Sequence, residues 1–420
     1  MKIFKFGGAS VKDADGVRNL LRILKMYQNE PLIVVISAMG KTTNSLEKLI
    51  KHYFENDKKK ALEALQEVKT FHEQITKELA NDSFKYLYTE IDNILVELES
   101  MLDRKPDGGY DYVYDQLICY GEIISTRIVS AYLLQEGLNN RWIDARNFIF
   151  TDDSYRRGRV NWELTEDMIS RRLKPIAEKH LVITQGFIGK NNHHANVTLG
   201  REGSDYTAAI MAWCTNASDV TIWKDVAGVM NGDPKRLKDA IKIDDLTYNV
   251  AIELAYYGAT IIHPKTIQPL KNKKIPLYVK SFINPEESGT VIKEGAEKKN
   301  EIPYYIFKKE QALMSISSKD FSFIVEDNLS HIFNEISKCG VTINVMQNSA
   351  ISFMLCINNE VDKIKALTTL LKKDYDIKIQ KDVELISIRN YNQESIDKML
   401  INRKVLMEQK SAKVIQFVLL

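Results

Sequence analysis

The opening of the chain combines a lysine with two glycines in the stretch Lys5-Phe6-Gly7-Gly8-Ala9-Ser10. Glycines let backbone N–H groups approach an anion closely, and the N-terminus of a following helix favours negative charge. A lysine at the same place adds a point charge that suits phosphate groups. The stretch therefore predicts a phosphate site, although a Gly-Gly turn on its own is also typical of a purely structural turn.

A second stretch, Thr198 to Thr207, brings glycines, an arginine and an acidic residue to an expected loop-to-helix junction. Arg201 can hold a carboxylate or a phosphate through two parallel hydrogen bonds. Ser204 or Asp205 could equally form an ordinary helix N-cap. The pattern alone leaves both interpretations of these two residues open.

A third stretch, from Trp223 to Lys235, follows an expected buried strand. Loops beyond the carboxyl ends of strands are where open α/β sheets bind ligands. Lys224 and Lys235 would suit a nucleotide there. The structural alternative is a turn-rich loop with solvated lysines.

Two further patterns are rejected as sites. Gly40-Lys41-Thr42 resembles the end of a P-loop, but that pattern requires a glycine where this chain has Val35. His193 and His194 lie in a polar loop, and neighbours in sequence rarely both ligate one ion. The sequence therefore predicts no metal site built by side chains.

The patterns around these stretches predict an α/β sheet domain. Residues 2–6 are typical of a strand, 11–27 show helical spacing, and the apolar run 32–36 is typical of a strand buried on both faces. Two apolar stripes within 58–104 predict a helical hairpin attached to this domain. Beyond Gly121 we expect strands at 181–184, 220–223 and, as the last, 275–279, with helices at 206–214 and 248–256.

The C-terminal part has a different pattern. Residues 284–303 are polar and predict a linker, so that the sheet domain would cover 1–283. Beyond the linker we expect strands at 304–307, 312–317, 341–346 and 351–357 and helices at 329–338 and 361–373. This order is typical of a small ferredoxin-like α+β domain. The remaining residues, 383–420, could supply part of a second such unit.

The composition limits the class of protein. The 420 residues are enough for two or three domains, and 44% of them are apolar, which suffices for real cores. The net charge of +2 argues against a dedicated nucleic-acid binder. The 4 cysteines form no CxxC pair, the N-terminus lacks a signal-peptide pattern, and no apolar run approaches the ~20 residues of a bilayer span. We therefore expect a cytoplasmic protein with neither nucleic-acid nor membrane partners.

Together these stretches resemble the amino-acid kinase superfamily, and within it the aspartate kinases, over nearly the whole chain. Lys5 to Ser10 is similar to the family's Lys-Phe-Gly-Gly signature, and Gly121-Glu122 is similar to its acidic substrate contact. Further matches are Ser37-Ala38 with Thr43-Asn44, Arg201 with Gly203-Ser204-Asp205, and Tyr257-Gly258-Ala259 with His263-Pro264. Several ordered motifs at long separations are far more specific than any one of them.

The resemblance implies an enzyme that uses ATP and Mg²⁺ to phosphorylate the side-chain carboxylate of L-aspartate, the first step of lysine, threonine and methionine biosynthesis. It implies an amino-acid-kinase-like α/β sheet sandwiched by helices, followed by ferredoxin-like α+β domains of the ACT type. Lys5 and Asp205 would be catalytic. ATP would be bound by Lys5, Gly7, Gly8, Ser10, Lys224, Asp225, Met230, Lys235, Thr260 and Ile261. The substrate would be bound by Ser37, Thr43, Glu122, Arg201, Gly203 and Ser204.

By the same resemblance, residues 312–380 would form one ACT-type unit, and 304–311 with 383–420 a second, shortened unit. Such units usually pair between subunits and bind amino acids there. The resemblance therefore implies a homodimer or larger homo-oligomer, with an amino-acid effector near Asn344 and Ser349. Which amino acid would act, for example lysine or threonine, stays open.

Three residues depart from the family pattern. Ala9 stands where threonine is common, Glu202 where glycine is common, and Thr260 where many members have lysine. Each departure could weaken ATP binding, and together they support one alternative, a non-catalytic regulatory protein that binds ATP or an amino acid. The other alternative is a kinase for another carboxylate or carbamate acceptor. Because the principal site residues are all present, the sequence predicts an active enzyme.

Overall fold

The chain forms two compact units in a computed structural model that describes residues 1–80, 85–259, 262–295, 302–320 and 322–420. The first unit comprises Met1–Val229, Lys242–Ile252 and Ile261–Ala296, and the second comprises Met230–Ile241, Glu253–Thr260 and Glu297–Leu420. The first contains a mainly parallel sheet with helices, and the second an antiparallel sheet with helices. This confirms the predicted α/β fold class.

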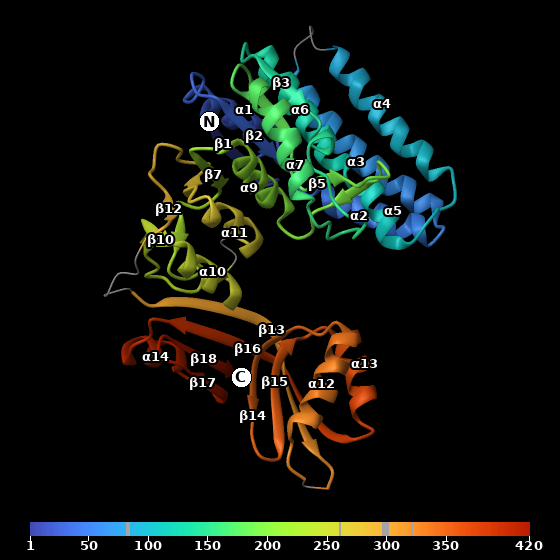
Figure 1. The fold of residues 1–420 in the computed structure, drawn as a ribbon. Coiled ribbons are helices and arrows are strands. Elements are labelled where there is room, and N and C mark those ends of the chain that lie inside the picture. The colour runs from blue at the N-terminus through green and yellow to red at the C-terminus, as the bar shows by residue number, and fades with distance from the viewer. Residues whose placement is uncertain (81–84, 260–261, 296–301, 321) are drawn as a thin grey trace. The chain divides into compact units, whose positions relative to one another are not determined.

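An eight-stranded sheet is the centre of the first unit (Figure 1). Its strands follow the order β10 (Asp245–Thr247), β12 (Thr290–Lys293), β11 (Leu277–Ser281), β7 (Asp219–Lys224), β1 (Lys2–Phe6), β2 (Leu32–Ile36), β4 (Leu181–Gln185) and β3 (Asn140–Ile143). Neighbours are parallel except at the β11–β12 pair. Every residue of β2 is buried, as expected of a strand that is covered on both faces.

Helices occupy most of the connections between these strands. They are α1 (Ala14–Lys25), α2 (Thr42–Phe54), α3 (Lys58–Leu79), α4 (Lys85–Leu102), α5 (Tyr110–Ile118), α6 (Tyr120–Gln135), α7 (Trp162–Met168), α8 (Lys174–Ala177), α9 (Gly203–Thr215), α10 (Tyr248–Tyr257) and α11 (Pro264–Asn272), with short turns η2 (Ala145–Asn147) and η3 (Ile169–Leu173). Strands β5 (Ile188–Lys190) with β6 (Asn196–Thr198), and β8 (Val229–Met230) with β9 (Lys242–Ile243), form two small sheets. Helices α3 and α4 pack on each other where the sequence predicts a helical hairpin.

One helical stretch, Tyr110–Gln135, is long and apolar enough to cross a bilayer. In its most apolar part, however, 89% of the residues are buried inside the fold. Its side chains therefore contact protein, as in the core helix of a globular domain.

Strand β12 differs from the sequence prediction, which places the last strand of the sheet at 275–279 and a linker at 284–303. The hydroxyl of Thr290, its first residue, is buried and donates to the carbonyl of Ile243 while accepting from the N–H of Val229. The apolar run here is only Val291-Ile292, which is too short to stand out in a polar stretch. Its pairing partners, β10 and β11, decide that it is a strand.

A six-stranded sheet is the centre of the second unit (Figure 1), with the order β14 (Ile343–Asn348), β15 (Ser352–Asn358), β13 (Tyr304–Ser318), β16 (Tyr375–Arg389), β18 (Val414–Leu419) and β17 (Val405–Lys410). Its helices are α12 (Glu326–Cys339), α13 (Val361–Leu371) and α14 (Gln393–Leu400). The separate strands expected at 304–307 and 312–317 are one long strand. A register shift between Lys308 and Gln311, with Glu310 at φ +53°, divides it into two halves.

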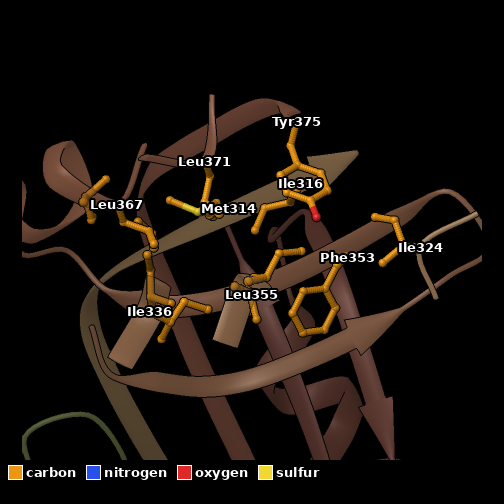
Figure 2. Packing of buried hydrophobic residues seen from close by; sticks show 13 residues of the cluster. Met314, Ile316, Ile324, Ile336, Phe353, Leu355, Leu367, Leu371 and Tyr375 are labelled. Carbon is orange, nitrogen blue, oxygen red and sulfur yellow. The ribbon is translucent and has the colours of Figure 1, made fainter. Parts of the chain in front are cut away.

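Each half of this sheet has its own core. The first core joins β13, β15 and the helices α12 and α13, with Met314, Leu355 and Phe353 at its centre (Figure 2). The second core joins Tyr305, Ile386, Met399 and Phe417 from β13, β16, α14 and β18. Both cores consist of buried apolar side chains, so each half can stabilise its side of the sheet.

Residues 230–241, which we call the inserted segment, complete the second core. Leu237 is 2% exposed and belongs to that core. Arg236 binds both carboxylate oxygens of Glu384, and its guanidinium lies 4.0 Å from the centre of the Phe307 ring. Asn231 donates to the carbonyl of Pro303 and accepts from the N–H of Ile241. The inserted segment thus covers apolar surface of the shortened half.

Candidate active site

The ends of the central strands bring the first predicted residues together. Residues Lys5 and Phe6 of β1 lie in register with Val35 and Ile36 of β2, and with Ile222 and Trp223 of β7. Ser37 and Lys224 are therefore placed beside the end of β1. These are carboxyl ends of parallel strands, the edge at which open α/β sheets bind ligands.

Lys5 and Asp205 form an ion pair at this edge. Lys5 Nζ lies 2.6 Å from Asp205 Oδ1, and the two side chains are 12% and 4% exposed. The N-cap of helix α9 is Glu202, so Asp205 lies in the first turn and is not the helix cap that the sequence left open. The carboxylate instead faces the lysine.

Three glycines allow this close arrangement. A Cβ on Gly7 would lie 3.3 Å from Lys5 Nζ, so the ammonium group lies directly over the Gly7-Gly8 turn. A Cβ on Gly8 would lie 2.5 Å from the carbonyl oxygen of Ala38. A Cβ on Gly186, the residue after β4, would lie 2.4 Å from the Cβ of Ser204. The glycines let the turn, the β2 loop and the start of α9 approach one another.

Glu122 is the buried acid of the site. Its side chain lies on α6, is 3% exposed, and its Oε1 receives a long 3.4 Å hydrogen bond from the N–H of Ala38. Oε2 is buried and has no hydrogen-bond partner among the described residues. Desolvation raises the pKa of Glu122 to about 8, against the weaker opposite effect of the Ala38 N–H. Among the described residues, the long hydrogen bond from Ala38 is thus the contact that opposes the cost of ionising Glu122, and Oε2 remains without a donor.

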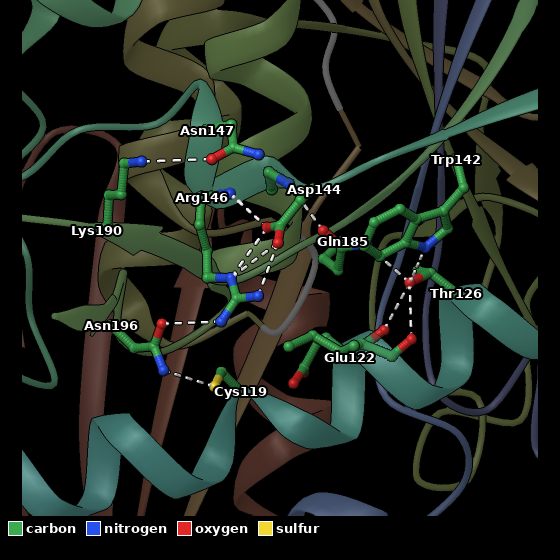
Figure 3. A network of polar contacts seen from close by, with 12 residues as sticks. Cys119, Glu122, Thr126, Trp142, Asp144, Arg146, Asn147, Gln185, Lys190 and Asn196 are labelled. Atoms are coloured by element: carbon green, nitrogen blue, oxygen red, sulfur yellow. Dashed lines mark hydrogen bonds and ion pairs between the residues drawn. The ribbon is translucent and has the colours of Figure 1, made fainter. Parts of the chain in front are cut away.

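A hydrogen-bond network fixes the helix that carries Glu122 (Figure 3). The hydroxyl of Thr126, one turn further along α6, donates to the carbonyl of Glu122. The same hydroxyl accepts from Gln185 Nε2 at 2.8 Å and from Trp142 Nε1 at 3.0 Å. Gln185 Oε1 in turn accepts from the N–H of Ala145. The network anchors α6 to β3 and β4 and so sets the depth of Glu122.

A cavity of about 940 Å³ joins these groups within the first unit. Of the predicted residues it is lined by Lys5, Ser37, Thr43, Glu122, Arg201, Gly203, Ser204, Asp205 and Lys224. The structure therefore brings the predicted substrate residues and the Lys5–Asp205 pair into one site.

Other predicted residues lie elsewhere. Gly7, Gly8, Ser10 and Asp225 do not line the cavity, and Ser10 is only 4% exposed. Met230 and Lys235 belong to the second unit, in the inserted segment. Thr260 and Ile261 lie outside the described residues.

The predicted effector residues lie in the second unit. Asn344 donates to Gln311 Oε1 and Asn358 Oδ1 and accepts from Lys308 Nζ. Ser349 is exposed and shares hydrogen bonds with Ser352. Their role in effector binding stays a prediction.

Several lining residues are not among the predicted site residues. Thr198, Gly200 and Glu202 belong to the stretch that the sequence singles out, but they were given no binding role. The others lie outside the predicted stretches; they are Glu47, Asp111, Tyr114, Tyr155, Arg156, Arg157 and Phe187. Glu47 could have been found, because it lies one helical turn after Thr43 on α2. The Tyr114 hydroxyl donates to Glu47, and the Arg156 guanidinium lies 4.4 Å from the Tyr114 ring. No local pattern marks Arg156 or Tyr114, which tertiary packing alone brings to the cavity.

Glu202 has a left-handed backbone, with φ +54° and ψ +28°. This region favours glycine over residues that carry a Cβ. The residue follows Arg201 in a turn closed by the hydrogen bond from the N–H of Gly203 to the carbonyl of Gly200. Glu202 thus adds both backbone strain and negative charge beside the arginine.

The sequence profile of the amino acid kinase family matches residues 1–281 of the chain. The chain is 32% identical to "Aspartokinase 1, chloroplastic" of Arabidopsis thaliana, over 85% of this chain and 63% of that protein. It is 28% identical to "Lysine-sensitive aspartokinase 3" of Escherichia coli (strain K12), over 85% of this chain and 78% of that protein. The chain thus spans less than two thirds of the plant relative.

Two solved structures of E. coli aspartokinase III are similar to the whole chain at 25% identity. One is a complex with lysine and aspartate, with a TM-score of 0.83 that covers 100% of this chain and 95% of that chain. The other is a complex with aspartate and ADP, with a TM-score of 0.83 and coverage of 100% and 96%.

Proposed function

The chain belongs to the amino acid kinase family, and from this premise we propose that it is an aspartate kinase, which transfers the γ-phosphoryl group of ATP to the side-chain carboxylate of L-aspartate. The observation that carries the proposal is the single cavity in which the Lys5–Asp205 ion pair meets Glu122 and Arg201. The aspartokinases to which the chain is similar support the same substrate.

This phosphoryl transfer does not require a general base. A free aspartate side chain has a pKa of about 3.9 and is already an anion at neutral pH. The enzyme must bring this anion to a second anion, the terminal phosphate, and neutralise charge as the phosphoryl group moves. Lys5 supplies a positive charge for that phosphate, and the Gly7-Gly8 turn, over which its ammonium group lies, supplies backbone N–H groups. Asp205 holds the ammonium group of Lys5 in position.

The remaining groups suit an α-amino acid. Arg201 binds the α-carboxylate, since a guanidinium pairs with a carboxylate through two hydrogen bonds. Glu122 binds the α-ammonium group, which supplies the partner that its buried Oε2 lacks. Ser37 and Thr43 line the same cavity and add hydrogen bonds. Lys224, the last residue of β7, and Asp225, which follows it, belong to the nucleotide side of the site.

Mg²⁺ would arrive with ATP. In the described part of the chain no group of three or more His, Cys, Asp or Glu side chains could hold a metal ion. A cation bound by phosphates needs only one or two carboxylates from the protein, and Asp205 fits that requirement. When bound, Mg²⁺ would neutralise phosphate charge.

Two groups of the site bear on the alternative functions: Glu122 on the identity of the acceptor, and the Lys5–Asp205 pair on whether the protein is catalytic. A carbamate acceptor carries no ammonium group, so a buried Glu122 without a partner favours an amino acid. A non-catalytic binding protein has no need of a lysine held against a carboxylate over a glycine turn.

The second unit supports regulation by an amino acid, as the name of the lysine-sensitive relative suggests. Its two antiparallel halves are the proposed ACT-type units, with the effector near Asn344 and Ser349 and pairing between subunits. The four cysteines are free, which supports a cytoplasmic enzyme.

Purified protein with ATP, Mg²⁺ and L-aspartate should form an acyl phosphate, which hydroxylamine traps as the hydroxamate, and should release ADP in equal amount. Glutamate, N-acetylaspartate and carbamate serve as comparison acceptors. Arg201→Ala should raise the aspartate KM with a smaller effect on the ATP KM. If ATP and aspartate bind without turnover, the protein is a sensor and not a kinase.

A further inference from the structure

Asp115 is a fully buried carboxylate to which the mechanism above assigns no role. It lies on α5, and its oxygens accept three hydrogen bonds. Oδ2 accepts from the N–H of Arg156 at 2.8 Å and from the N–H of Thr198 at 2.9 Å. Oδ1 accepts from the hydroxyl of Thr198 at 2.8 Å. One side chain thus joins a helix to two separate loops.

Both loops carry arginines that line the cavity. Arg156 lies in the first, and the second follows Thr198, the last residue of β6, and leads through Gly200 to Arg201. The N–H of Gly158 donates to the carbonyl of Thr198, and a Cβ on Gly200 would lie 3.0 Å from the carbonyl oxygen of Arg156. The two loops therefore lie directly against each other.

The loops have little regular structure of their own. Arg156, Gly200 and Glu202 have φ angles of +65°, +80° and +54°, all in the left-handed region. Glycine adopts this region freely, but for Arg156 and Glu202 such a backbone persists only when the surroundings hold it there. The carboxylate of Asp115 supplies acceptors to the loop N–H groups at the point where the loops meet.

Burial of this acid has a cost. Desolvation raises the pKa of Asp115, although the N–H groups of Arg156 and Thr198, the Thr198 hydroxyl and the charge of Arg156 oppose the rise. A core built for stability alone would avoid such a group. Loops that must hold arginines at a substrate offer a reason to keep it.

We propose that Asp115 is the positioning residue of the amino-acid site: by clamping the loops at Arg156 and Thr198, it holds Arg201 where the substrate α-carboxylate binds. The inference rests on the proposed function. Asp115 acts through the loops and touches neither ATP nor the transferred phosphoryl group.

The test compares Asp115→Ala, Asp115→Asn and Leu117→Ala with the wild type. Leu117 is 1% exposed on the same helix and does not line the cavity. Its truncation should therefore destabilise the fold, as loss of the Asp115 side chain does, while the hydrogen bonds from Asp115 to the two loops remain. Asp115→Asn retains an oxygen for the two N–H groups, and its amide can donate to the Thr198 hydroxyl. The readouts are the KM values for aspartate and ATP, kcat, and the dissociation constant of aspartate by calorimetry.

Asp115→Ala should raise the aspartate KM and dissociation constant about tenfold or more, with the ATP KM changed less than about twofold. Asp115→Asn should restore most of the affinity, and Leu117→Ala should lower the melting temperature with aspartate affinity near that of the wild type. Unchanged aspartate affinity in Asp115→Ala, or equal losses in Asp115→Ala and Leu117→Ala, would overturn the inference while the kinase activity stands. A wild type that binds aspartate without turnover would refute the kinase and leave the calorimetric comparison decisive for Asp115.

Discussion

Lys5 Nζ and Asp205 Oδ1 lie 2.6 Å apart, so that a strand end and a helix start share one buried ion pair. The lysine is held by the acid and faces the glycine turn at the same time. Its charge is thus oriented before any substrate binds, which is how a protein stabilises charge that develops in a transition state.

Lys5→Ala should lower kcat for phosphoryl transfer by about 10²–10³-fold, because it removes a preorganised charge from the transition state. Asp205→Asn should lower kcat in the same direction. Since the two groups act together, the double variant should lose less than the sum of the single losses, with a coupling of about 1–3 kcal/mol. Steady-state hydroxamate formation measures all three variants. Strictly additive losses would show that the pair does not act as a unit.

Aspartate binding should depend on the protonation of Glu122, whose pKa burial raises to about 8. Below that pH the free carboxyl is neutral and must lose a proton to pair with the α-ammonium group. The aspartate dissociation constant should therefore rise as pH falls below 8, approaching about tenfold per pH unit. Calorimetry between pH 6 and about 8.5, in buffers of different ionisation enthalpy, measures the affinity and the released proton. A flat affinity profile with no proton release would contradict this prediction.

Glu122 should also lower stability at high pH. Its folded pKa of about 8 lies above the ordinary value of 4.5, so the folded state holds the proton more tightly. Stability is then retained below pH 4.5 and lost as pH rises through 8. Glu122→Gln should raise the melting temperature at about pH 8.5 and weaken aspartate binding at the same pH. A lower melting temperature for this variant would show that burial of the ionised Glu122 carboxylate does not destabilise the fold at this pH.

Glu202→Gly should improve both stability and substrate affinity. Glycine relieves about 1 kcal/mol of left-handed backbone strain, and loss of the carboxylate lowers the aspartate KM a few-fold. Glu310→Gly is the matched control, since Glu310 has φ +53° in β13 of the second unit. The control should gain stability with no change in the aspartate KM. Kinetics and thermal unfolding separate the two effects, and a higher aspartate KM in Glu202→Gly would show that the acid assists binding.

Leu237→Ala should destabilise the second unit by about 2–3 kcal/mol, because it opens a cavity in the core that the inserted segment completes. Lys238→Ala, an exposed neighbour in the same segment, is the control and should leave stability unchanged. Chemical denaturation followed by limited proteolysis would locate the loss. Equal stability of the two variants would show that Leu237 does not support this core.

The sequence by itself determined the sheet edge of the site. The buried run of β2 and the glycine turn after β1 follow from local rules of burial and backbone freedom, and they predict Lys5 at the end of a strand. The pattern around α9 singled out Arg201 and left the role of Asp205 open. The resemblance to a family supplied Ser37 and Glu122 and gave Asp205 its predicted role. Short polar-flanked β12 was missed, because two apolar residues carry no periodic signal.

Only the tertiary structure decided how distant segments meet. Asp205 has the residue type of a helix cap, yet it pairs with Lys5 because α9 begins beside the end of β1. Arg156 and Asp115 come together through loops whose left-handed conformation no local pattern encodes. Local sequence preferences determine helices, strands and turns. The pairing of a buried charge depends on the packing of the whole unit, because only that packing excludes water and makes an unpaired charge costly.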